Sequence, residues 1–176
     1  IAGVVGNGEW IAAAAGQSNT APVSFGQLPP GFQRTTLTTA LVEPTVMDFT
    51  PDGRLFVGER GGRIRVWQNG QFLASPLLQL AVDTENGERG LAGMAAHPDF
   101  ATNGWLYLYY TTTEPRDRVG RFTVSGNSVN PASEVLIWQN SHLSCVFHHG
   151  GGMRFGPDGK LYLAVGDQFD GSNAQN

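Results

Sequence analysis

The chain has 176 residues, a formal net charge of −4 at pH 7, 40% hydrophobic residues and only 15% charged residues. This composition is apolar enough for a packed core and excludes a charge-driven disordered protein. The sequence contains no basic run, which argues against a nucleic-acid-binding or membrane-surface protein. No apolar stretch reaches the roughly 20 residues that a membrane span needs.

Residues 1–30 are rich in Ala, Gly, Ser and Pro, and we interpret them as an extended N-terminal lead-in with one strand near residues 23–25. The segment lacks the basic start of a signal peptide. It is either what remains after such a peptide was removed or a plain N-terminal arm. The single cysteine, Cys145, cannot form an internal disulfide, and this leaves the cellular compartment open.

From residue 31 onward, short apolar runs alternate with turn residues, and this pattern predicts an all-β fold. The chain contains 24 Gly and 10 Pro, which is typical of a protein built from strands and turns. The only helical turn that we predict covers residues 75–80.

An internal repeat is the most informative feature of the chain. Residues 47–59, 94–110 and 153–166 each contain a short strand, a Pro-Asp turn with a glycine, and a strand that includes Leu followed by an aromatic residue. The repeats start roughly 50 residues apart, a period typical of β-propeller blades. Third strands are predicted at Arg63–Gln68 and at residues 118–124.

We therefore predict a partial β-propeller over residues 31–176. Its blades lie near residues 32–74 and 77–127, and an incomplete blade covers 135–176. A sandwich made of similar hairpins is the alternative. Because a propeller needs about four to eight blades to close, we expect the rest of the ring in a second chain or in a further C-terminal segment.

Histidines are the candidates for a general base or for metal ligands. His148 and His149 are adjacent, so in a strand they point to opposite sides and only one can face a channel. An imidazole suits a general base because its pKa lies near neutrality. As an alternative, His142, Cys145 and His148 could be metal ligands, but no fourth ligand completes a tetrahedral set. Cys145 is more simply explained as a small buried residue.

Other residues are assigned to structure. Asp52 and Asp158 belong to the Pro-Asp-Gly turns. Trp105, Tyr107 and Tyr109 alternate on one face of a strand, which favours a place in the core. The charged group Glu59, Arg60, Arg63 and Arg65 is interpreted as the surface of a solvated edge strand, and a charged rim of the channel is the alternative.

Two strings resemble a known family. ERGLAGMAAHPDFATNGWLYLYYT (residues 88–111) and HHGGGMRFGPDGKLYLAVGD (residues 148–167) are similar to the soluble quinoprotein glucose and sorbosone dehydrogenases. The resemblance runs from about Leu28 to Asn176. It implies a six-bladed propeller that carries pyrroloquinoline quinone (PQQ) and oxidises an aldose at its anomeric carbon to a lactone. On this resemblance, the chain supplies the first half of the ring.

The resemblance also implies functions for individual residues. His148 matches the general base, and Asp167 matches the aspartate that supports it. Glu88 matches a polar residue near the sugar, while Gln168 or Gln175 matches a glutamine that, like His148, approaches the quinone. The family's calcium ligands and its Lys and Arg contacts to the quinone lie in later blades. We therefore expect no metal ligand in this chain, and we expect the isolated chain not to bind PQQ tightly.

The resemblance implies a periplasmic or secreted protein with a small sugar as its substrate, and no nucleic-acid partner is expected. It leaves two alternatives open. The family includes propellers of the Hedgehog-interacting type, so the protein could be an extracellular module that binds a sugar or a protein without redox chemistry. The chain could also be a fragment with no activity of its own.

Overall fold

The computed structural model describes residues 2–5, 9–12, 31–33, 35–85, 87–141 and 145–174. The chain divides into two compact units, Ile1–Leu41 and Val42–Asn176. In the first unit, β1 (Ala2–Val5) pairs antiparallel with β2 (Glu9–Ala12), a hairpin that we did not predict from the sequence. The strand predicted at residues 23–25 lies outside the described residues.

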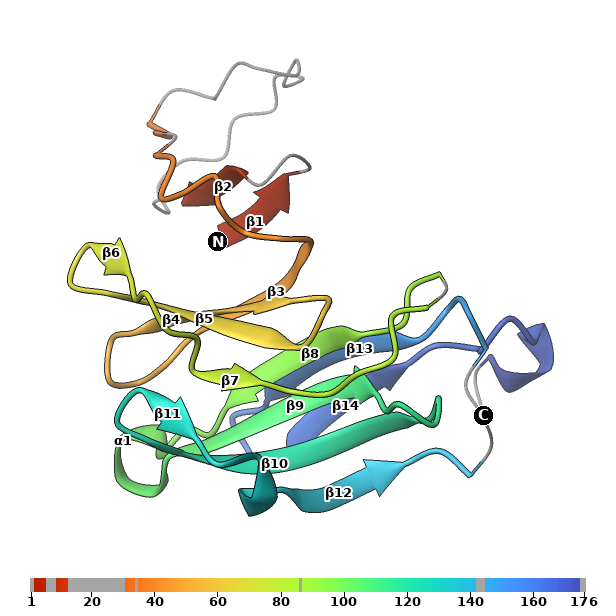
Figure 1. The fold of residues 1–176 in the computed structure, drawn as a ribbon. Coiled ribbons are helices and arrows are strands. Elements are labelled where there is room, and N and C mark those ends of the chain that lie inside the picture. Colours follow the sequence, from red (N-terminus) through yellow and green to blue (C-terminus); the bar gives the residue numbers. More distant parts are fainter. Residues whose placement is uncertain are drawn as a thin grey trace. The chain divides into compact units, whose positions relative to one another are not determined.

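The second unit begins with a sheet in which each strand pairs antiparallel with the next, as in a propeller blade (Figure 1). β5 pairs with β4 on one side and with two short strands, β6 and β7, on the other. The strands of this first blade are β3 (Pro44–Phe49), β4 (Leu55–Glu59), β5 (Arg63–Gln68), β6 (Gln71–Phe72) and β7 (Leu78–Gln79).

The second blade repeats this topology. β10 pairs with β9 on one side and with both β11 and β12 on the other. Its longer first turn contains the short helix α1 (Phe100–Asn103), and a 3-10 turn, η1 (Pro131–Ser133), precedes β12. The strands are β8 (Leu91–Ala96), β9 (Trp105–Thr111), β10 (Asp117–Ser125), β11 (Ser128–Val129) and β12 (Val135–Gln139).

The third repeat is a hairpin of β13 (Gly150–Phe155) and β14 (Leu161–Val165), followed by the 3-10 turn η2 (Gly171–Asn173). The three predicted hairpins are thus confirmed, as is the third strand of each complete blade. In the described part of the chain, no helix is long and apolar enough to cross a membrane.

Two sequence predictions are wrong in detail. The helical turn expected at residues 75–80 is absent, and β7 lies there instead because its backbone pairs with β5. The segment 135–139 was assigned to the third repeat. As β12 it pairs with β10 and belongs to the second blade. The sequence of β12 does not say which sheet it joins, because that depends on its pairing with a strand distant in the chain.

The second blade packs on both of its faces, because side chains of β9 alternate between the two sides of the sheet. Leu106, Leu108 and Tyr110 are buried in the core shared with the first blade. Tyr107 and Tyr109 are buried in the core shared with the third hairpin. The predicted assignment of these two tyrosines to the core is confirmed.

The inner strands β3, β8 and β13 lie side by side, with β8 in the middle. The Thr45 hydroxyl donates to the Leu91 carbonyl at 2.6 Å, and the Ala96 N–H donates to the Asp48 carboxylate at 2.8 Å. Burial raises the pKa of Asp48 above its ordinary value. Consecutive sheets that meet through their first strands form wedges around one axis, which is propeller geometry and excludes a two-layer sandwich.

A pair of glycines sets the spacing between β8 and β13. A Cβ on Gly93 would lie 2.1 Å from the Gly151 carbonyl oxygen, a distance that no carbon atom can tolerate. Gly151 has a φ of +106°, in the region that favours glycine. These two residues let the backbones of neighbouring inner strands touch.

We expect Gly93→Ala to lower the free energy of unfolding by about 1–3 kcal/mol, because β8 and β13 must separate to admit the methyl group. Urea unfolding measures this change. Gly61→Ala is the matched control, since a Cβ on Gly61 meets nothing within 4 Å. Equal stabilities of the two variants would contradict this account of the strand spacing.

Candidate active site

The third hairpin brings two predicted site residues together. His148 comes just before β13 and Asp167 just after β14, and the pairing of Gly150 with Val165 joins these strand ends. The His148 Nδ1 atom lies 2.7 Å from the Asp167 Oδ1 atom. The His148 side chain is 51% exposed, so a solute can reach the imidazole while the carboxylate orients it.

Unusual backbone angles shape this corner. His148, Gln168 and Phe169 have φ values of +61°, +57° and +64°, in the left-handed region that non-glycine residues rarely adopt. Hydrogen bonds stabilise the arrangement: the Gln168 N–H donates to the His148 carbonyl at 3.2 Å, and the Phe169 N–H donates to Asp167 at 3.0 Å. Strained backbone of this kind clusters at functional sites.

Glu88, the predicted sugar-binding residue, lies at the same corner. Its carboxylate accepts the His148 N–H at 2.8 Å, and its own N–H donates to the Val146 carbonyl at 2.9 Å. The loop before β8 is thereby tied to the segment before β13. Glu88 is exposed, so its carboxylate can also accept a hydroxyl group from solution.

Beneath the exposed pair lies a second, buried imidazole and carboxylate. The His149 Nδ1 atom is 2.9 Å from the Asp117 Oδ1 atom, and both side chains are almost fully buried. The His149 side chain is buried whereas that of His148 is exposed, so only one of the two is open to a solute, as predicted. The reason is not strand alternation, because both residues precede β13 and His148 has a left-handed backbone. Tyr109 donates to the His149 carbonyl at 2.7 Å. Burial, and then the Asp117 charge, raises the pKa of Tyr109 and keeps this donor protonated.

Gln168 faces this buried layer. Its Oε1 atom accepts the Cys145 N–H at 3.0 Å, and its Nε2 atom donates to Asp117 at 2.5 Å. The sequence predicts Gln168 as a contact to the quinone, but here its amide binds the scaffold. Gln175, the other candidate glutamine, lies outside the described residues.

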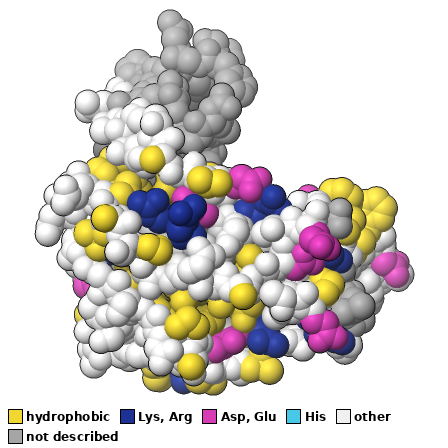
Figure 2. Space-filling view, in the orientation of Figure 1, with side chains coloured by type: hydrophobic (Ala, Val, Ile, Leu, Met, Phe, Trp, Pro, Cys, Tyr) yellow, Lys and Arg dark blue, Asp and Glu magenta, His cyan; other side chains and the backbone are white. Residues whose placement is uncertain are grey.

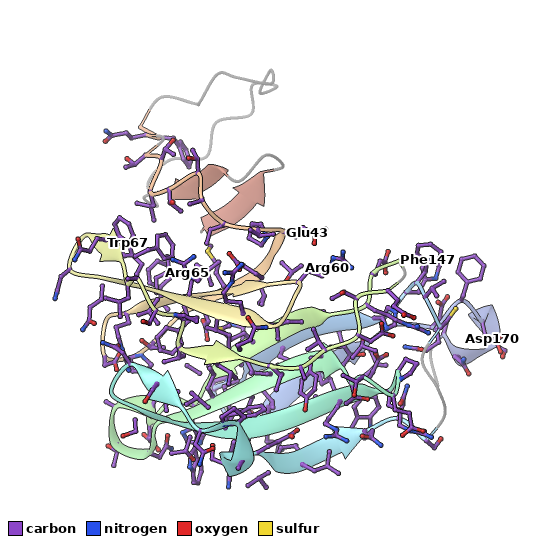
Figure 3. All side chains as sticks on the ribbon, in the orientation of Figure 1. Glu43, Arg60, Arg65, Trp67, Phe147 and Asp170 are labelled. Carbon is purple, nitrogen blue, oxygen red and sulfur yellow. The ribbon has the colours of Figure 1, made fainter. Side chains whose placement is uncertain are left out.

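Aromatic rings flank the exposed imidazole. The Phe169 ring centroid lies 5.0 Å from that of His148 and 6.2 Å from that of Phe147. Both phenylalanines are exposed, Phe147 at 43% and Phe169 at 66%. Figure 2 shows hydrophobic side chains gathered at the end of the molecule where Figure 3 labels Phe147. The site therefore combines a base, two carboxylates and an apolar surface.

The His148–Asp167 pair can accept a proton from a hydroxyl group. With Asp167 ionised, the His148 Nδ1–H is the donor of their hydrogen bond, and the lone pair on Nε2 can accept a proton. The carboxylate stabilises the imidazolium that results. A solute hydroxyl group that reaches Nε2 meets a general base in its reactive tautomer.

Comparisons with known proteins bear on this site. The sequence model of the family described as glucose/sorbosone dehydrogenase matches residues 41–176. The chain belongs to this family. The matched residues include His148, Asp167 and Glu88, and they take in both complete blades and the third hairpin.

Family relatives differ in their described activities. A Hedgehog-interacting protein of Mus musculus is 32% identical over 149 residues, which are 72% of this chain and 21% of that protein. An aldose sugar dehydrogenase of Escherichia coli K12 is 29% identical over 142 residues, covering 77% and 38%. The chain thus spans well under half the length of these relatives.

Solved structures show the same fold. The PQQ-bound aldose sugar dehydrogenase of Streptomyces coelicolor superposes with a TM-score of 0.66 and 27% identity, over 78% of this chain and 42% of that protein. The two blades and hairpin described above are therefore part of a β-propeller of the family type.

The residues at His148 do not by themselves fit PQQ, which carries three carboxylates. The side chains that hydrogen-bond to His148 are the carboxylates of Glu88 and Asp167, which repel such a ligand. Lys160 is at the opposite end of the hairpin, 3.3 Å from Asp158.

The metal alternative gains no support from the geometry. Across the described ranges, no three His, Cys, Asp or Glu side chains are grouped to hold a metal ion. His142, one of the three suggested ligands, lies outside these ranges. Cys145 is partly buried, and its N–H is bound by Gln168.

Sequence reasoning missed two residues of the site, Asp117 and Phe169. Asp117 is fully buried, but in the sequence it stands between Arg116 and Arg118 at the start of a strand, where a charged residue usually faces solvent. Phe169 follows the recognised GD turn within a polar loop. No pattern in a single sequence marks either residue, because both gain their neighbours from segments distant in the chain.

Proposed function

We propose that the complete protein oxidises an aldose at its anomeric carbon and releases a lactone. The observation that carries this proposal is the His148–Asp167 pair, an exposed imidazole oriented by a carboxylate in a family that contains sugar dehydrogenases. Oxidation of a hemiacetal removes one proton from the hydroxyl oxygen and one hydride from the carbon. His148 is suited to the first of these tasks.

In this proposal the sugar's anomeric hydroxyl group approaches His148 Nε2 and transfers its proton there. Asp167 holds the imidazole by Nδ1 and stabilises its charged form. Glu88 accepts a hydrogen bond from another hydroxyl of the sugar and so orients the ring. PQQ, when bound by the complete protein, supplies the two-electron acceptor for the hydride.

The rest of the propeller completes the site. We assign the quinone's cationic contacts and a calcium site to blades outside this chain. Tyr162 of β14 is 58% exposed and lies on the face opposite Leu161 and Leu163, which pack against the second blade, so it is open to cover by the next sheet of the ring. The family resemblance supports a periplasmic or secreted location, which fractionation of the source cells tests.

Dye reduction tests the activity. The complete protein is loaded with PQQ and calcium and given a panel of aldoses with an electron-accepting dye. Sugar-dependent reduction of the dye, with lactone as the product, supports the proposal. Absence of turnover with every aldose, in protein shown by absorbance to hold PQQ, overturns it.

A binding function is the second candidate, favoured by the 32% identity to a Hedgehog-interacting protein. In that case the residues around His148 bind a sugar or a protein surface without redox chemistry. Saturable binding of a sugar without oxidation, measured by calorimetry, supports this candidate over the enzyme. An inactive fragment shows neither binding nor turnover.

Phe169 provides a test of sugar contact. We expect Phe169→Ala to raise KM for the aldose by about tenfold, because the ring offers an apolar surface to the C–H face of a pyranose beside His148. Steady-state dye reduction measures the change. Phe169→Tyr keeps the ring and serves as the control. Unchanged KM in the alanine variant would remove Phe169 from the binding surface.

A further inference from the structure

We propose that Asp117 is a positioning residue for the His148–Asp167 pair, an inference that rests on the proposed function. Asp117 binds the residue that follows each of them in the chain: His149 on Oδ1 at 2.9 Å and Gln168 on Oδ2 at 2.5 Å. One buried carboxylate thereby holds both strands of the third hairpin at the point where the site is built.

The position of Asp117 fits this task. It starts β10 in the second blade, so its backbone belongs to a different sheet from the hairpin that it holds. The Thr111 hydroxyl donates to Oδ1 at 3.2 Å, and the Asn140 N–H donates to the Asp117 carbonyl at 3.1 Å. The carboxylate is thus fixed by its own blade before it contacts the third.

Gln168 links Asp117 to the catalytic side chains over a short path. Gln168 has a left-handed backbone, and its N–H donates to the His148 carbonyl at 3.2 Å. Asp167, its chain neighbour, accepts the Phe169 N–H at 3.0 Å. A rotation of Gln168 therefore moves Asp167 relative to the imidazole. A shift near 1 Å at a catalytic group can cost about 100-fold in rate.

Asp117→Asn exposes this dependence because the hydrogen bonds cannot all be remade. The new amide keeps an oxygen for His149 and Thr111 but presents an N–H to the Gln168 Nε2 donor. If Gln168 flips its amide to accept that N–H, its own donor then faces the Cys145 N–H. In both arrangements one donor meets another donor. The remaining arrangement turns the new N–H toward His149 Nδ1 and moves the histidine proton to Nε2, a buried atom without a hydrogen-bond partner among the described residues. Each arrangement therefore leaves a donor unsatisfied in a mostly buried layer and weakens the hold on Gln168.

The paired variant Asp117→Asn with Gln168→Glu restores the hydrogen bond between the two positions and the bond to the Cys145 N–H. The amide introduced at position 117 then donates to one oxygen of the carboxylate introduced at position 168, and the Cys145 N–H donates to the other. The total charge of the pair is unchanged. Rescue by this double variant separates the hydrogen-bond pattern from the mere size of the side chains.

The experiment compares the complete proteins well below their unfolding temperatures. For Asp117→Asn we expect kcat to fall by about 10-fold to 100-fold with KM changed by less than about threefold. We expect the backbone amides of Gln168 and Phe169 to exchange with deuterium at least about tenfold faster. The double variant returns both values to within about threefold of the starting protein.

Glu59→Gln is the matched control. Glu59 is a buried carboxylate of the first blade that accepts the Val42 N–H and the Arg63 side chain. We expect it to lower stability without altering kcat or the exchange of the Gln168 and Phe169 amides. Gln168→Met is made alongside Asp117→Asn. It removes the same contact, leaves the Asp117–His149 bond in place, and has no amide that could rearrange.

The outcomes are distinct. Normal kcat and normal amide exchange in both Asp117→Asn and Gln168→Met overturn the positioning function, as does a double variant that stays impaired. If the starting protein oxidises no aldose, the proposed function fails on its own. The amide exchange rates, which need neither cofactor nor sugar, then still decide whether Asp117 orders the loop.

Discussion

Replacement of His148 by alanine is expected to lower kcat with an aldose by a factor of about 10² to 10⁴, the range that general-base catalysis contributes. The hydroxyl proton then has only water as an acceptor at that position. KM is expected to change much less, because Glu88 and the aromatic rings remain. Steady-state dye reduction by the PQQ-loaded complete protein gives both constants.

His97→Asn is the control for this experiment. His97 follows β8 at the far end of the second blade, where its Nδ1 atom accepts the Asp99 N–H at 3.0 Å. We expect this substitution to affect stability rather than kcat. A His148→Ala variant with full turnover would show that another group accepts the proton, and the enzymatic proposal for this site would be wrong.

The sequence was sufficient for the repeating architecture because each hairpin carries its own turn chemistry. In the first turn, Asp52 accepts the Thr50 hydroxyl and the Arg54 side chain, and Gly53 has a φ of +88°. The Arg54 hydrogen bond holds the pKa of Asp52 below its ordinary value. Such local signals survive in any context, so the Pro-Asp-Gly motif predicts a hairpin wherever it recurs.

Features that depend on distant pairing were not predictable. Glu59 was interpreted as part of a solvated edge strand, but it is 1% exposed and 2.5 Å from the Arg63 side chain. The interpretation was wrong because Glu59 ends β4, which pairs with β3 on one side and with β5 on the other. A single sequence does not say which strand ends up at an edge, and it therefore does not say which charges are buried.

The same difference between local and distant contacts applies to the candidate site. The family resemblance predicted the pair of His148 and Asp167. The two residues flank one hairpin, so the pairing of β13 with β14 brings them together. Asp117 reaches Gln168 from another blade, 51 residues away in the chain. Contacts within a hairpin follow from local sequence, whereas contacts between blades need the whole packing arrangement.

Packing between blades leads to the largest expected effect on stability. Phe56 of β4 is fully buried, and its ring meets that of Phe100 in α1 edge-on, with centroids 5.8 Å apart. The Arg54 guanidinium lies 4.9 Å from the Phe56 ring centroid and donates to the Gly126 carbonyl at 2.6 Å. One aromatic side chain of the first blade therefore supports both an apolar and a polar contact to the second.

We expect Phe56→Ala to lower the free energy of unfolding by about 3–5 kcal/mol, since the cavity also removes the surface on which Arg54 rests. Urea unfolding of the complete protein measures it. Phe72→Ala is the control, because Phe72 lies partly exposed in the outer strand β6, and its ring contacts, to Trp67 and Arg65, stay within the first blade. If the two substitutions cost the same, the blade interface is not what stabilises this end of the ring. A greater cost at Phe56 shows that contacts between the two blades stabilise this part of the ring. Each sheet of a propeller contacts little besides its neighbouring sheets, so these contacts must carry much of its stability.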